Sequence, residues 1–80
     1  MMQDVIVAIE AVIEEMVEFQ KKKVLKVANQ IDPRLTPEDI RNPQDIPAIY
    51  KDAMFNYEDG ILTGYLSMQT AVRVKIREMQ

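Results

Sequence analysis

Apolar residues recur at spacings of three and four along the first third of the chain, which predicts one long helix over about residues 3–31. Two apolar seams run along this helix. The first extends over its whole length and comprises Ile6, Ile9, Ile13, Val17, Val24, Val27 and Ile31. The second comprises Val5, Ala8, Val12, Met16 and Phe19 and then stops, because Lys23, Lys26 and Gln30 occupy its continuation. The full-length seam therefore predicts a long partner helix, and the half-length seam predicts a shorter partner.

A second helical pattern covers about residues 57–79, and Asn56 is its expected N-cap. Its apolar seam comprises Tyr57, Ile61, Tyr65, Met68, Val72, Ile76 and Met79. Beside this seam runs a stripe of small residues, Gly60, Gly64, Ser67 and Ala71. Glycine inside a helix costs about 1 kcal/mol relative to alanine, so two glycines on one face require a reason. We expect this small-residue stripe to pack closely against another helix backbone.

All four prolines lie between the two helices and exclude a continuous helix there: Pro33, Pro37, Pro43 and Pro47. Thr36 and Asn42 each precede a proline and acidic residues, a pattern typical of helix starts. We therefore predict short helices, one of them over about residues 47–52. Apolar residues are frequent in this proline-rich segment, about residues 33–55, so we expect it to pack across the long helices as a lid.

These elements predict an all-α fold with a single helical domain over residues 1–80. The two long helices are expected to pair antiparallel, joined by the proline-rich segment and its short helices. A chain this small buries only ~60% of the surface that its unfolded form exposes, and oligomerisation commonly supplements such a core. We therefore expect a homodimer that forms a helical bundle, with Val5, Ala8, Val12, Met16 and Phe19 at its interface.

The composition excludes most catalytic chemistry. The chain has no cysteine and no histidine, so it has no disulfide, no thiolate or imidazole metal ligand, and no Cys/His or Ser/His/Asp catalytic group. Glu10, Glu14 and Glu18 recur on one helix face, but the familiar carboxylate bundles also require Glu-x-x-His pairs. We predict no catalytic residue, no metal site and no cofactor.

Charge and hydropathy restrict the partners and the location. A net charge of −3 is the wrong sign for a general nucleic-acid or anionic-membrane binder. No apolar run reaches the ~18 residues of a membrane span. Asp4 stands where an export signal has basic residues, and Glu10 interrupts the apolar run, so we expect a cytoplasmic protein.

The sequence supports two functional hypotheses. The first is an interaction or regulatory module without catalysis, whose partners are a second copy of the chain and a further protein. The alternative is a small helical enzyme or ligand-binding protein with a pocket between the lid and the bundle. The first is favoured, because the unusual features of the sequence indicate interfaces and no reactive group is supplied. A deep polar pocket lined by Tyr50 or Tyr57 would favour the second.

Overall fold

The computed structural model describes residues 1–80, and it contains helices and no strands. The long helices are α1 (Met2–Ile31) and α3 (Ala53–Met79). The proline-rich segment, residues 32–52, contains two short 3₁₀-helices, η1 (Asp39–Arg41) and η2 (Pro43–Asp45), and the single-turn helix α2 (Pro47–Tyr50). The predicted all-α class is therefore confirmed.

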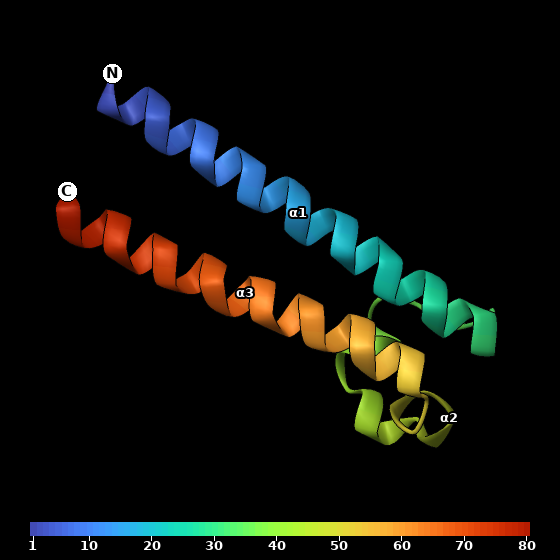
Figure 1. Ribbon diagram of the computed structural model, residues 1–80. Helices are drawn as coiled ribbons and strands as arrows, with labels where there is room; N and C mark the ends of the chain where they lie inside the picture. Colours follow the sequence, from blue (N-terminus) through green and yellow to red (C-terminus); the bar gives the residue numbers. More distant parts are fainter.

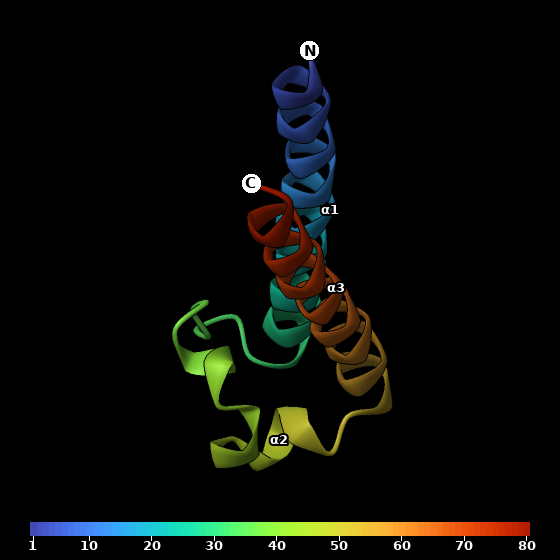
Figure 2. The ribbon, with the colours of Figure 1, turned by 90° about the vertical axis from the view of Figure 1, so that its left-hand side faces the viewer.

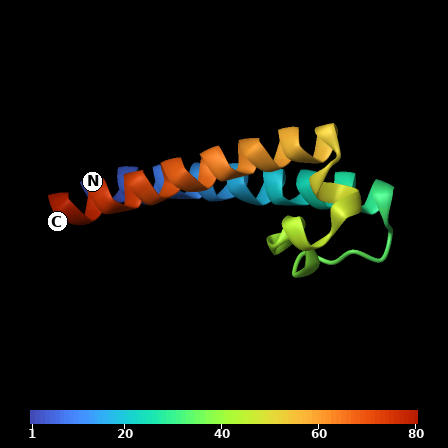
Figure 3. The same cartoon turned by 90° about the horizontal axis from the view of Figure 1, so that it is seen from below.

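The molecule is an elongated helix pair with a small appendage. Helices α1 and α3 lie side by side, and both chain ends lie at the same end of the pair (Figure 1). We call this the terminal end. The principal extents are 47 × 19 × 18 Å. The proline-rich segment lies at the other end and projects to one side of the pair (Figures 2 and 3). Neither long helix has an apolar stretch of the length needed to cross a membrane.

The face of α1 that packs against α3 follows the predicted full-length seam in part: Ile6, Ile13, Val17 and Val24 are buried, Val27 is half-buried, and Ala28 is buried beside them. Its buried residues are Ile6, Ile13, Val17, Gln20, Val24 and Ala28. Ile9 and Ile31, which were expected in the seam, are exposed. Gln20 enters the seam instead, because it lies three residues after Val17 and four before Val24 and so continues the same helical stripe.

The seam of α3 differs more from its prediction. The buried residues of α3 are Phe55, Glu58 and Gln69, and its half-buried apolar residues are Ile61, Leu62, Tyr65, Val72 and Ile76. Four of the seven residues in the predicted seam are therefore partly covered. Tyr57, Met68 and Met79, which were predicted to be core residues, are exposed. The buried stripe of α3 includes two polar residues, Glu58 and Gln69. A seam drawn through the apolar residues alone is therefore displaced around the helix from the stripe that is buried.

Polar contacts between the long helices fix their alignment. The side-chain amide of Gln20 donates to the Glu58 backbone carbonyl and to its carboxylate Oε1, both at 2.9 Å. Lys23 Nζ lies 3.7 Å from the Glu58 Oε2. Nearer the terminal end, the Gln69 amide donates to Glu14 Oε2 at 3.0 Å. Each contact joins one residue of α1 to one residue of α3, so a shift of one helix along the other would leave buried polar groups unpaired.

Helix α3 begins earlier than predicted because Asp52, and not Asn56, is its N-cap. The Phe55 backbone N–H donates to Asp52 Oδ2 at 2.8 Å, which satisfies a free N–H in the first turn. Asn56 lies inside the helix, where its side-chain amide donates to the Tyr50 carbonyl at 2.7 Å. This contact ties the end of α2 to the start of α3.

The proline-rich segment is anchored at the end of the helix pair and does not lie across its length. Ile49 and Phe55 pack against Val24 and Ala28, and all four side chains are buried. The Asn29 amide donates to the Leu35 carbonyl at 2.8 Å, which holds the chain where it leaves α1. The predicted lid is therefore a cap on one end of the pair.

We expect Gln20→Leu to lower the free energy of unfolding by about 1–3 kcal/mol, because the buried Glu58 carboxylate loses its amide donor. Adding Glu58→Leu to this variant removes the unpaired carboxylate and should recover part of the lost free energy of unfolding. Denaturant unfolding of both variants and the unmodified protein measures the difference. If Gln20→Leu unfolds at the same denaturant midpoint as the unmodified protein, the contact between Gln20 and Glu58 contributes nothing to stability.

Candidate interaction surface

The half-length seam of α1 is open in the structure. Its five residues, Val5, Ala8, Val12, Met16 and Phe19, are all exposed, and Phe19 retains 67% of its accessible surface. The proline-rich segment packs near Val24 and Ala28, beyond the end of this seam. The shorter partner that the seam requires is therefore not supplied by this segment.

Helix α3 extends this open surface. A shallow hollow between the helices is lined by Glu15, Met16 and Phe19 of α1 and Tyr65 of α3. Tyr57, Ile61 and Met68 lie at helical spacings from Tyr65 and so share its side of α3. We call the combined surface the open apolar face. It comprises Val5, Ala8, Ile9, Val12, Met16 and Phe19 of α1 and Tyr57, Ile61, Tyr65, Met68 and Met79 of α3.

The opposite side of the helix pair is polar. There Glu14 accepts the hydrogen bond from Gln69, and Arg73 lies 3.6 Å from the same carboxylate. A second, narrower hollow on this side includes Glu10 beside Gln69 and Arg73. The polar contacts between the helices therefore lie on one side of the pair and the open apolar face on the other, while Val7, Leu66 and Val74 are exposed outside this face.

Most large apolar side chains of this chain lie outside its core. Seven hydrophobic residues are buried, whereas sixteen large ones are exposed. Single exposed apolar residues are ordinary, but a contiguous apolar patch on a small protein marks a site of interaction. The open apolar face is such a patch, because its members follow one another along two adjacent helices.

The small-residue stripe of α3 borders this face. Gly60, Gly64, Ser67 and Ala71 are exposed, and a Cβ atom added at either glycine would meet no atom within 4 Å. No backbone of this chain therefore packs closely on the stripe. The predicted close packing requires another chain, and it stays a prediction.

The acidic residues of α1 have partners of their own or lie in solvent. Glu14 contacts Gln69 and Arg73, and Glu18 pairs with Lys21 at 3.4 Å. No group of three or more potential metal ligands is assembled. On α3, partial burial raises the pKa of Asp59 above its ordinary value. These carboxylates are separate features and form no common site.

The space between the proline-rich segment and the long helices is filled by side chains. Ile49 and Phe55 occupy it and are fully buried. Tyr50 and Tyr57, which would line a pocket there, are exposed instead. The two hollows described above are lined by residues of α1 and α3 and by none of the proline-rich segment.

Sequence spacing located the α1 half of the open apolar face but not the α3 half. The sequence analysis assigned the α3 residues of this face to the seam that packs against α1. The spacing of Glu58, Tyr65 and Gln69 is the signal that would have separated the buried stripe of α3 from its exposed stripe.

No family model matches the chain, and no characterised protein or solved structure matches it.

Two substitutions at Gly64 test the small-residue stripe. Gly64→Ala should stabilise the isolated chain by about 1 kcal/mol, because the added Cβ meets nothing and alanine favours the helix. Gly64→Leu should weaken self-association, because a large side chain keeps another backbone away. Sedimentation velocity measures association, and thermal unfolding at low concentration measures the chain itself. Normal association of Gly64→Leu would show that no backbone packs on the stripe.

Proposed function

We propose that this protein is a self-associating helical interaction module that acts without catalysis in the cytoplasm. The observation that carries this proposal is the open apolar face, which covers one side of the helix pair and has no partner within the chain. Its occupant is the same face of a second copy, which would convert two helix pairs into a four-helix bundle.

The size of the face supports a stable dimer. Its α1 part, from Val5 to Phe19, is about 21 Å long by the ~1.5 Å rise per residue of an α-helix, and the molecule is 19 Å wide. A flat patch of these dimensions covers roughly 400 Å², about half of the ~800 Å² that each partner contributes to a standard interface. Full burial of each Val, Ile or Met side chain contributes about 1.5–3 kcal/mol, which offsets the entropy lost on association.

The proline-rich segment is the proposed contact site for a further protein. It lies at the end of the molecule away from the chain termini, and its short helices leave Arg41, Tyr50 and Lys51 exposed. Prolines hold its backbone and so reduce the entropy lost on binding. The alternative, a ligand pocket beneath this segment, has less support, because Ile49 and Phe55 fill that space.

Two valines of α1 provide a matched test of self-association. Val12 and Val7 are both 56% exposed, but only Val12 belongs to the open apolar face. Val12→Lys should raise the dimer dissociation constant at least tenfold, because it places a charge inside the interface. Val7→Lys adds the same charge on the same helix and should leave association unchanged. Light scattering over a concentration series measures both.

Val12→Lys combined with Met16→Lys should give monomers at micromolar concentration. Circular dichroism shows whether these monomers remain helical, which separates lost association from lost folding. Equal association of the Val7 and Val12 variants would exclude the open apolar face as the interface.

Charge reversal on the proline-rich segment tests the contact with a further protein. Lys51→Glu and Arg41→Glu should each weaken partner capture, while the free energy of unfolding stays within about 0.5 kcal/mol, because both side chains are exposed. Affinity capture with each variant, compared with the unmodified protein, is the measurement. If the unmodified protein and both variants capture the same proteins in the same amounts, the proline-rich segment is excluded as the contact site.

A further inference from the structure

The proposed self-association leaves open how the second copy is oriented, and any orientation of the dimer rests on that proposal. Two such faces, with their helices aligned, can meet about a two-fold axis in two ways. An axis parallel to the helices places α1 over α3 of the second copy and keeps both proline-rich segments at one end. An axis perpendicular to the helices places α1 over α1 and α3 over α3, with the proline-rich segments at opposite ends.

The exposed seam of α1 has symmetric spacing. Its members follow one another at intervals of three, four, four and three, in the order Val5, Ala8, Val12, Met16 and Phe19. Val12 is the midpoint, so a perpendicular axis at this residue places Ala8 opposite Met16 of the second copy. The same axis places Val5 opposite Phe19. In both pairs a smaller side chain meets a larger one, which lets the two apolar surfaces interdigitate.

Two lysines lie where the seam ends. Lys23 and Lys26 follow Phe19 by four and seven residues, so they lie on the same side of α1, nearer the proline-rich segment. With a perpendicular axis at Val12, the seam of the second copy covers α1 as far as Phe19. Both lysines then lie beyond this apolar contact, where their ammonium groups remain accessible to water.

The parallel axis is less favourable for the same lysines. It keeps every residue at its own level along the bundle, and Lys23 is level with Glu58, because their charged groups lie 3.7 Å apart within the chain. Lys23 would then meet α3 of the second copy where Tyr57 and Ile61 form the open apolar face. An ammonium group placed against apolar side chains opposes association. The side chains on the open side of the molecule therefore favour the perpendicular axis.

Helix α3 accommodates the perpendicular axis. Glu14 contacts both Gln69 and Arg73, which places the midpoint of the α1 seam about level with Ala71. The axis therefore brings the two α3 helices together near Ala71, and the small-residue stripe to which it belongs is not covered by this chain. Lys75 comes against the second copy with either axis and does not distinguish them.

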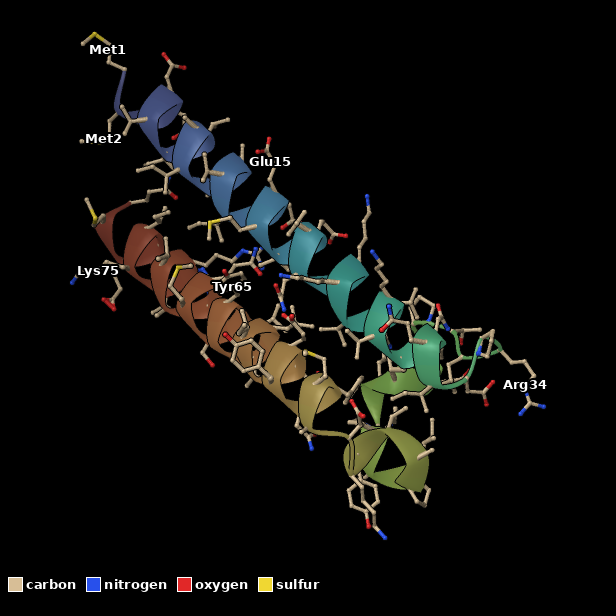
Figure 4. The ribbon with its side chains drawn as sticks, turned by 45° about the vertical axis from the view of Figure 1, so that its right-hand side comes forward. Met1, Met2, Glu15, Arg34, Tyr65 and Lys75 are labelled. Atoms are coloured by element: carbon tan, nitrogen blue, oxygen red, sulfur yellow. The ribbon has the colours of Figure 1, made fainter.

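We infer that two copies associate with α1 antiparallel over α1 about a two-fold axis near Val12, so that the proline-rich segments lie at opposite ends of the dimer. Figure 4 shows the two ends of one copy: Met1, Met2 and Lys75 lie at the terminal end, which the second copy overlaps, and Arg34 marks the free end. The dimer then carries two identical contact sites for a further protein that face away from each other. Such an assembly bridges two molecules of its partner.

Part of the open apolar face stays uncovered beside each contact site. Tyr57 lies beyond the overlap and retains 66% of its accessible surface. The hydrogen bond from Asn56 to the Tyr50 carbonyl holds the exposed Tyr50 at the same end of the molecule. Tyrosine tolerates water through its hydroxyl group and is enriched at protein interfaces. The surface that the dimer offers at each end therefore includes both tyrosines.

Two charge substitutions test which residues of the seam face each other. Ala8→Lys and Met16→Glu should each raise the dimer dissociation constant at least tenfold, because each places a charge in the apolar contact. Combined in one chain, they should weaken association about tenfold less than the product of the single effects, because the new ammonium group and carboxylate meet across the axis. The two positions are more than two turns apart on α1, so this pair forms only between copies.

Val7→Lys combined with Met16→Glu is the matched control. It introduces the same two charges, but Val7 lies outside the open apolar face, so this variant should associate no better than Met16→Glu alone. Sedimentation velocity over a concentration series measures each dissociation constant, and circular dichroism verifies that the helices are retained. A purely multiplicative effect of Ala8→Lys and Met16→Glu, or an equal recovery in the control, would overturn the inferred orientation.

A distance measurement gives an independent test that leaves the seam unchanged. The chain has no cysteine, so Gln30→Cys creates a single site for a spin label at the far end of α1. In the inferred dimer the labels lie 18 residues from the axis on either side, about 54 Å apart. With a parallel axis they are separated only by the width of the bundle, below about 30 Å given interaxial distances of 8–10 Å.

Mass and distance together separate the outcomes. A dimer with a label distance near 54 Å supports the inferred orientation. A dimer with a distance below about 30 Å overturns the orientation and leaves the proposed self-association intact. A monomeric mass at the concentration of the measurement overturns both.

Discussion

A pair of helices can bury only one stripe of each helix, and this constraint determines the rest of the structure. Helix α1 carries two apolar stripes, and α3 covers one of them. The proline-rich segment adds a small core at one end, where Ile49 and Phe55 meet Val24 and Ala28. Nothing in 80 residues remains to cover the stripe from Val5 to Phe19. The imbalance between what the helices expose and what the chain can cover is the physical basis of the proposed function.

The polar contacts within the helix pair select one alignment of α1 and α3. Apolar stripes alone tolerate sliding of one helix along another, whereas the bonds from Gln20 to Glu58 and from Gln69 to Glu14 are made in one alignment only. That alignment determines which charges are level with each other. It brings Glu14 beside Arg73 and so juxtaposes the acidic part of α1 with the basic part of α3.

Helical spacing and the four prolines were sufficient to predict the two long helices, the irregular middle and the all-α class. Spacing also located the stripe of α1 that the chain leaves exposed. The seam of α3 was predicted only in part, because two of its buried members are polar, and Tyr57, Met68 and Met79, which were assigned to it, are exposed. Glu58 and Gln69 are tolerated in the seam only because Gln20 and Glu14 bind them, and partners 38 and 55 residues away cannot be read from local sequence.

The start of α3 shows the same limit on a smaller scale. Asp52 and Asn56 are both good N-cap residues, and composition alone does not choose between them. The choice depends on where α2 ends, because Asn56 is held by the carbonyl of Tyr50. The sequence likewise does not determine where the proline-rich segment packs, since its apolar residues could be covered either across the long helices or at their end.

The mass of the unmodified protein in solution tests the central claim most directly. Sedimentation equilibrium over a concentration range that includes the micromolar region should give a mass approaching twice the 9.3 kDa of the chain, with dissociation on dilution. This result is predicted because the open apolar face has no partner within the chain. A constant mass of 9.3 kDa throughout this range would show that the face remains exposed to water, and it would contradict the account.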